Sequence, residues 1–323
     1  MKKRDKKLGI FYPTRPPKRG RTKGALQISF TWLFAIIAGG FILFLAIFMT
    51  SKLIGTEQVA QDLKSGKEIG VLLNPIEMGF ESAKSTSITM PVETRISTRC
   101  EEDNNFGKQI INLSQKSFGK WTDTKTEVKF PNKYIFSENP EAKTFYIFAK
   151  PFEFGFKVAD LIYMTSSEKE YCFKNAPEDI KKEIEFLNQK NFVTENCKLD
   201  SIEVCFSGSC EIEVNYNAKY VRKDESKMYF SNDALMYATI FSDSRTYECQ
   251  IKRLMQRVEN LALLYKDKSD FIAGKYDCNS NLDLVGLENA AKSLSSSANL
   301  NLVSSIAEEV DYENGRNGEC RLW

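Results

Sequence analysis

The sequence contains no histidine in 323 residues. This absence excludes Ser-His-Asp triads, zinc or iron held by histidine, and imidazole acid–base chemistry at neutral pH. The motifs G-x-S-x-G, G-x-x-x-x-G-K-[ST], G-x-G-x-x-G and H-E-x-x-H are missing as well. We therefore expect no cofactor and no metal ion, and no residue can be named as catalytic.

Positive charge is concentrated at one end of the chain. Residues 1–24 hold ten basic residues and one acid, a balance of +9. The rest of the chain holds 35 basic and 42 acidic residues, so the net charge of +2 describes neither part. A basic cluster beside an apolar segment ordinarily fixes topology and contacts anionic lipid, so we expect no nucleic-acid partner.

An uncharged segment follows the basic tail and ends at Lys52. A helix of about 20 apolar residues crosses the hydrocarbon core of a bilayer, so we predict a transmembrane helix over residues 25–51 that contacts membrane lipid. Residues 49–51 offer no A-x-A-like cleavage site, which disfavours a secretory signal peptide. The positive-inside rule then places residues 1–24 in the cytoplasm and the C-terminal domain outside the cell membrane.

All the cysteines lie on the side predicted to be outside. They are Cys100, Cys172, Cys197, Cys205, Cys210, Cys249, Cys278 and Cys320. An even number confined to one side of a membrane predicts disulfides in an oxidising compartment. No C-x-x-C occurs, and a thiolate zinc site would need unfamiliar spacings. The connectivity stays open from sequence alone.

A β-hairpin is predicted for residues 201–216, because apolar residues alternate on both sides of a Ser-Gly-Ser turn. A register with both apolar sets on one face places Val204 opposite Ile212. Cys205 then points to the other face, so we expect it to bond elsewhere, with Cys197 a candidate. A bulge in the turn would instead restore a local bridge to the cysteine five residues later.

The same register brings two carboxylates together, those of Glu203 and Glu213. A like-charge pair raises a carboxyl pKa and is therefore the candidate in this sequence for acid–base or cation chemistry. The alternative is an ordinary solvated sheet face, which is the more common origin of such a pair.

Strand patterns dominate the first part of the exported region and helix patterns the last. Residues 86–158 are rich in β-branched and aromatic residues, with an alternating run at 152–158. Helices are predicted from about residue 178, from Ser244, and in two segments after Leu284. This order predicts an α+β fold rather than a doubly wound sheet.

The domain boundaries follow from these patterns. Residues 52–75 are predicted to continue as a juxtamembrane helical segment that ends at Asn74-Pro75. Residues 76–323 are predicted to form the disulfide-braced extracytoplasmic α+β domain.

The N-terminus resembles the start of archaeal type IV prepilins and archaellins. The resemblance lies in Arg21 and Lys23, then Gly24, then an uncharged helix. It implies cleavage after Gly24, with Ala25 as the first mature residue, and assembly through the apolar helix. Ser29 stands at the fifth mature position, where prepilins often carry an acid.

A second resemblance lies within the exported region, chiefly in residues 233–238 and 248–255. These segments look like parts of uncharacterised single-pass membrane-anchored proteins of small-genome (DPANN-type) archaea. The resemblance implies a location and no mechanism.

Three functions are compatible with the sequence. The first is a non-enzymatic cell-surface protein whose ectodomain binds protein partners or supports the envelope. The second is a pilin-like subunit cleaved after Gly24, and the third is an exported hydrolase that uses carboxylates. The sequence specifies neither the ligand nor the oligomeric state.

Overall fold

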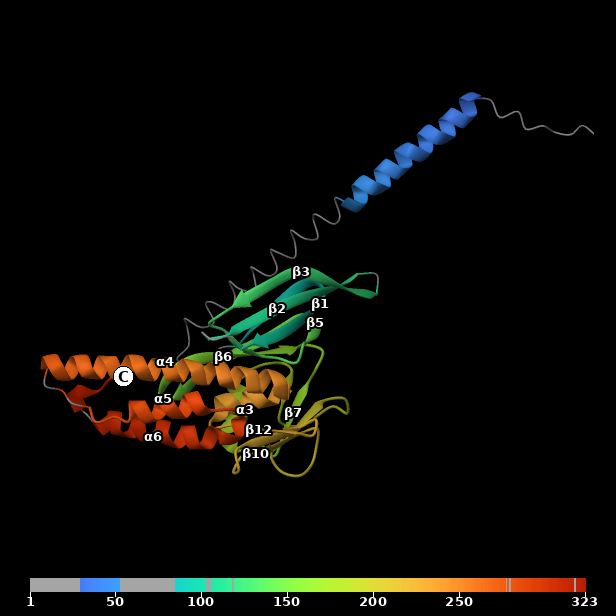
Figure 1. The fold of residues 1–323 in the computed structure, drawn as a ribbon. Helices are drawn as coiled ribbons and strands as arrows, with labels where there is room; N and C mark the ends of the chain where they lie inside the picture. The colour runs from blue at the N-terminus through green and yellow to red at the C-terminus, as the bar shows by residue number, and fades with distance from the viewer. Residues whose placement is uncertain are drawn as a thin grey trace, which may run out of the picture. The chain divides into compact units, whose positions relative to one another are not determined.

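The computed structural model describes residues 30–52, 85–102, 106–117, 119–276, 278, 280–316 and 318–323. The chain divides into two units, with the boundary after Gly55, and each is described by itself (Figure 1). The tail at residues 1–24, the Gly24 cleavage site and the juxtamembrane segment at 53–75 lie outside the described residues.

The first unit contains one apolar helix, Phe30–Lys52, of 23 residues with a mean hydropathy of 2.6. Its aromatic and aliphatic side chains are exposed, and none of its most apolar window is buried inside the protein. At 1.5 Å per residue the helix is roughly 34 Å long, close to the thickness of a bilayer core. The predicted N-terminal apolar helix is confirmed, and it is long and apolar enough to cross a membrane.

The second unit begins with a six-stranded sheet in the order β3-β2-β1-β5-β6-β4. The strands are β1 (Ser85–Glu101), β2 (Lys108–Ser117), β3 (Lys120–Phe130), β4 (Tyr134–Phe136), β5 (Glu141–Phe154) and β6 (Phe156–Ser166). Neighbours pair antiparallel except β4 with β6, which are parallel. The strand-rich region predicted at residues 86–158 is therefore confirmed.

The alternating run at residues 152–158 is a turn between two strands. Gly155 adopts a φ of +80°, a conformation that other residues rarely adopt, and it separates β5 from β6. Phe154 pairs with Phe156 across the turn, so both rings lie on one face. The alternation of apolar and polar residues therefore continues through the turn, and the sequence pattern alone does not reveal that the chain reverses there.

A second six-stranded sheet has the order β12-β11-β10-β9-β7-β8. Its strands are β7 (Tyr171–Lys174), β8 (Phe192–Val193), β9 (Ile202–Cys205), β10 (Ile212–Asn215), β11 (Tyr220–Lys223) and β12 (Ser226–Tyr229). The four strands β8, β7, β9 and β10 run parallel, and β10, β11 and β12 run antiparallel.

The hairpin prediction for residues 201–216 was wrong in direction. Val204 does lie opposite Ile212, but β9 and β10 are parallel. Alternation reports which face of a strand is buried and leaves the direction of its neighbour open. Parallel neighbours usually need a crossover of a dozen or more residues, whereas this link is short and is closed by a Cys205–Cys210 bond.

Five α-helices complete the described part of this unit. They are α2 (Glu178–Leu187), α3 (Asp233–Ile240), α4 (Ser244–Tyr276), α5 (Leu284–Ser293) and α6 (Leu300–Arg316). The helices predicted from residue 178, from Ser244 and after Leu284 are confirmed. Helix α3 has no apolar stripe to detect, because almost every one of its side chains is buried. Figure 1 shows α4, α5 and α6 side by side.

Two hydrophobic clusters form the core of the second unit. The larger joins β5 and β6 to the second sheet and to the helices, and includes Phe148, Tyr237 and Leu254. The smaller lies within the first sheet and includes Ile96 and Ile147. Strands come mainly first and helices mainly last, so the α+β prediction is confirmed.

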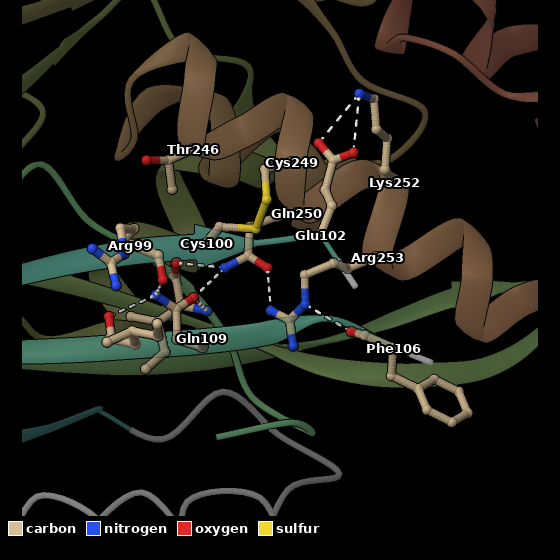
Figure 2. Close-up of a disulfide and its surroundings, with 12 residues drawn as sticks. Arg99, Cys100, Glu102, Phe106, Gln109, Thr246, Cys249, Gln250, Lys252 and Arg253 are labelled. Atoms are coloured by element: carbon tan, nitrogen blue, oxygen red, sulfur yellow. Dashed lines mark hydrogen bonds and ion pairs between the residues drawn. A yellow bond between two sulfur atoms is a disulfide. The ribbon is translucent and has the colours of Figure 1, made fainter. Parts of the chain in front are cut away.

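Four disulfides pair all eight cysteines: Cys100–Cys249, Cys172–Cys197, Cys205–Cys210 and Cys278–Cys320. The expectation that Cys205 bonds away from its own loop was wrong, because the parallel link turns back on itself. The Cys100–Cys249 bond ties the first sheet to α4, and Figure 2 shows it beside Gln109 and Gln250.

Candidate functional site

The two carboxylates of the predicted acidic pair do not face each other. In the parallel register Glu213 lies opposite Cys205. Glu203 forms an ion pair with Lys174, while Glu213 pairs with Arg222 at 2.9 Å. Each carboxylate is therefore neutralised by its own base, and the arrangement that a carboxylate-dependent hydrolase would use is not formed.

An open cleft of about 460 Å³ lies beside Glu213. Three segments contribute to it: the connection from β7 to α2, the link between β9 and β10, and β10 with its turn to β11. The lining residues are Asn175, Pro177, Cys205, Phe206, Ser207, Gly208, Glu213, Val214, Asn215, Tyr216, Asn217 and Tyr220.

One wall of the cleft is a loop closed by the Cys205–Cys210 disulfide, whose cysteines are 5 positions apart. Gly208 adopts a φ of +86°, and a Cβ built on it would meet no atom within 4 Å. Ser207, Gly208 and Ser209 are exposed. The loop is thus held in shape by a covalent bond while its tip faces solvent.

Aromatic rings form a second feature of the cleft. The Tyr216 ring lies 6.4 Å from the Phe206 ring, and the Tyr216 hydroxyl donates to Asp233 at 2.9 Å. Partial burial and this hydrogen bond raise the pKa of Tyr216 to about 12. The Tyr216 hydroxyl therefore keeps its proton at physiological pH, and the bond to Asp233 holds the ring in place.

Tyr220 is also held in position by its neighbours. The Lys227 ammonium lies 3.9 Å from the centre of the Tyr220 ring. The Asn215 amide donates to the Tyr220 hydroxyl at 3.4 Å and its oxygen accepts from the Ala218 N–H at 2.9 Å. The turn that carries these side chains is thus stabilised by its own hydrogen bonds.

Three polar side chains of the cleft, those of Asn175, Ser207 and Asn217, make no hydrogen bond within the described chain. Each amide both donates and accepts, and the serine hydroxyl does the same. Among the described residues, the lining holds one carboxylate, that of Glu213, and no Lys or Arg. Because Arg222 neutralises Glu213, the cleft is polar and nearly uncharged.

A second cavity, of about 670 Å³, differs in character. It lies at the beginning of α4 and is lined by Arg99, Asp243 and Arg245, and by the Cys100–Cys249 disulfide. Two of its three charged side chains, those of Arg99 and Asp243, already interact within the protein. Arg99 pairs with Glu101 at 3.0 Å. Asp243 accepts from the Thr246 N–H and caps the helix.

One group of side chains has the spacing of metal ligands. Potential ligand atoms of Glu203, Cys205 and Cys210 lie within 4.8 Å of one another. Zinc and other soft metals bind cysteine as the thiolate. Because both sulfur atoms are joined in a disulfide, this group does not offer the required ligands, and we assign no metal to it.

No protein-family model, no curated protein and no solved structure matches the chain.

Sequence reasoning placed Glu213 and Cys205 among the candidates but missed the rest of the cleft. The signal that it overlooked is the turn at residues 215–220, Asn-Tyr-Asn-Ala-Lys-Tyr, which holds two aromatic and two amide side chains within six residues. Such a turn has the composition of a recognition loop, but only the fold brings it against the Cys205–Cys210 loop.

Proposed function

We propose that this protein is a single-pass, membrane-anchored, extracytoplasmic binding protein that uses the cleft beside the Cys205–Cys210 loop for recognition. The observation that carries the proposal is the cleft: Tyr, Asn, Ser and Gly line it, and its Ser207 and Gly208 lie on a loop closed by a disulfide. These residue types supply rigid aromatic area and adaptable hydrogen bonds, which are the means that binding loops use.

Its location is supported by two independent features. Disulfides persist in oxidising compartments, and every cysteine of the chain is paired in one. The apolar helix Phe30–Lys52 follows a basic tail, which favours a cytoplasmic N-terminus. The resemblance of residues 233–255 to anchored proteins of small-genome archaea agrees with this placement.

Two cysteine variants of the full chain test this topology. Thr14→Cys places a thiol in the basic tail, and Asn301→Cys places one on the exposed face of α6. A membrane-impermeant maleimide added to intact cells is expected to label the Asn301→Cys protein and not the Thr14→Cys protein. The tail thiol should react only after permeabilisation, and labelling in the reverse order would overturn the proposed topology.

A pilin-like subunit is the second candidate, favoured by the resemblance at residues 21–30 and by the fully exposed apolar helix. In that case the apolar helix would pack against other copies after processing. N-terminal sequencing of the mature protein separates the two: an unprocessed or Met-trimmed N-terminus supports the anchored binding protein, and Ala25 as first residue supports the pilin-like subunit.

A further inference from the structure

We infer that the cleft beside the Cys205–Cys210 loop binds a neutral glycan. This inference rests on the proposed function, since it names the ligand class of the same cleft. Charge, hydrogen-bonding capacity, aromatic surface and sheet topology each narrow the choice of ligand.

The charge of the cleft argues against anionic ligands. Phosphate, sulfate and carboxylate groups are bound in proteins by Arg and Lys, and by the N–H groups at helix N-termini. Among the described residues no Lys or Arg lines this cleft, and its one carboxylate is that of Glu213. The cleft adjoins the N-terminus of α2 at Pro177, but the first turn of this helix carries Glu178 and Asp179, which oppose an anion there. A strongly cationic ligand is also disfavoured, because Arg222 already occupies the Glu213 carboxylate at 2.9 Å. A neutral ligand remains.

The polar side chains match a ligand rich in hydroxyl groups. A hydroxyl donates one hydrogen bond and accepts others, and so do the amides of Asn175 and Asn217 and the hydroxyl of Ser207. These three side chains are uncommitted within the described chain. They come from three separate segments, the β7–α2 connection, the β10–β11 turn and the disulfide loop, so each segment contributes a hydrogen-bonding group to the cleft.

The aromatic rings match the other surface of a sugar. One face of a pyranose carries C–H groups, and it packs against the electron-rich face of an aromatic ring. Tyr216 and Tyr220 line the cleft with rings whose positions are set by Asp233 and Lys227. Because these rings are fixed before binding, little conformational entropy is lost when a ligand stacks on them.

A peptide ligand is disfavoured by the sheet topology. Extended peptides commonly bind by adding a strand to an open sheet edge. Strands β9, β10 and β11 contribute residues to this cleft, and each of them is paired on both sides. No open strand edge therefore faces the ligand here, whereas a ligand that needs no backbone partner is accommodated.

The experiment uses the full chain in nanodiscs, because sugar-headed detergents would compete for the cleft. The protein is applied to an array of neutral oligosaccharides of glucose, mannose, galactose and N-acetylhexosamines. The same array carries their sulfated and uronic-acid counterparts and a set of peptides. We expect binding to neutral members, and the neutral oligosaccharide with the strongest signal then serves as the probe for titration calorimetry.

Five variants relate this binding to the cleft. Tyr220→Ala and Asn217→Ala are each expected to weaken affinity about tenfold or more, equivalent to about 1.4 kcal/mol. Tyr312→Ala and Asn301→Ala are the matched controls, because these residues are exposed on α6, and both should bind as the parent does. Tyr220→Phe keeps the ring and should bind within about twofold of the parent.

Each other outcome overturns the inference. Preference for acidic glycans or peptides would contradict the ligand class. Equal binding by the Tyr220→Ala and Asn217→Ala proteins, with near-ultraviolet circular dichroism showing that both fold, would place the glycan elsewhere. If the protein binds no member of the array, a glycan ligand is rejected. The maleimide labelling tests the anchored topology independently of this result.

Discussion

At the scale of single residues, the most unusual side chain is Arg253, which is fully buried in α4. Its guanidinium donates to the backbone oxygen of Phe106 at 2.8 Å and to the Gln250 amide oxygen at 2.7 Å (Figure 2). It also donates to the backbone oxygens of Lys133 and Pro131, both at 3.0 Å. Burial lowers the pKa of Arg253. Five N–H donors in a planar fork allow one side chain to satisfy several loop carbonyls at once.

Replacement of this arginine should be strongly destabilising. Arg253→Ala removes the donor to three backbone carbonyls, of which that of Lys133 is buried, and to the buried Gln250 amide oxygen. It also opens a cavity, so we expect a loss of roughly 3 kcal/mol or more. Thermal unfolding followed by near-ultraviolet circular dichroism measures the change. Arg245→Ala on the same helix is the matched control, since Arg245 is exposed; an equally stable Arg253→Ala protein would contradict the assigned role.

Glu170 should make folding sensitive to acid. Hydrogen bonds from Lys198 at 2.5 Å and Ser201 at 2.9 Å lower the pKa of Glu170. The unfolded chain therefore takes up a proton at a higher pH than the folded chain. The stabilising contribution of Glu170 is complete above the unfolded pKa and is lost as pH falls through the folded pKa.

The matching measurement is the melting temperature between about pH 5 and pH 3. Over this range the parent should lose more stability than Glu170→Gln, which has no carboxyl to protonate at this position. Glu309→Gln, a change of an exposed residue on α6, should follow the parent profile. Parallel profiles for the parent and Glu170→Gln would reject the assignment.

At the scale of elements, the β5–β6 turn packs closely against α6. Gly155 has a φ of +80°, and a Cβ at this position would lie 3.1 Å from the Ala307 carbonyl oxygen. The turn is therefore restricted twice, by its own backbone conformation and by the helix packed against it. Glycine is the only residue that meets both conditions without strain.

Comparison of two glycine substitutions separates these conditions. Gly119 has a similar φ of +76°, but no atom lies within 4 Å of a Cβ added there. Gly119→Ala should therefore lower the free energy of unfolding by about 1 kcal/mol, from backbone strain alone. Gly155→Ala should cost about 2 kcal/mol or more, because α6 must also move. Equal losses of unfolding free energy for the two variants would show that α6 can move away from the added Cβ without cost.

At the scale of the whole folded unit, two of the four disulfides have contrasting roles: one joins the first sheet to the helices, and the other closes a short loop. Cys100–Cys249 connects residues 149 positions apart, from the first sheet to the helices. Cys205–Cys210 connects residues 5 apart and closes only the loop beside the cleft. Restriction of the unfolded chain grows with the length of the closed loop, so the two bonds should contribute very differently to stability.

Paired serine variants give the corresponding prediction. Cys100→Ser with Cys249→Ser should lower the free energy of unfolding by about 5 kcal/mol, against about 2 kcal/mol for Cys205→Ser with Cys210→Ser. The second variant should melt roughly 4 to 8 °C below the parent and remain folded, while it loses affinity for the array probe because the loop is no longer preorganised. A larger loss of stability from the short loop would reverse this division of roles.

How much of the molecule could be predicted depended on how local each signal was. The apolar helix, the helices α4 and α6, and the strand-rich first part follow from periodicity along the chain, which neighbouring residues impose on one another. The helix α3 and the strand direction of β10 were missed or mistaken. Both depend on which distant segments pack around them, and α3 carries no periodic pattern because it is buried on all sides.

The sequence by itself determined that this chain has an apolar segment long enough for a membrane, that its basic residues precede that segment and its cysteines follow it, and that it lacks imidazole chemistry. Only the tertiary structure decided which cysteines form disulfides with each other. It also decided that Glu203 and Glu213 form ion pairs with different basic residues, and that Tyr216 and Asn175 line one cleft. Composition and periodicity are properties of the chain alone. Contacts between residues that are distant in sequence depend instead on the one arrangement of helices and strands in which all their apolar faces are buried at the same time.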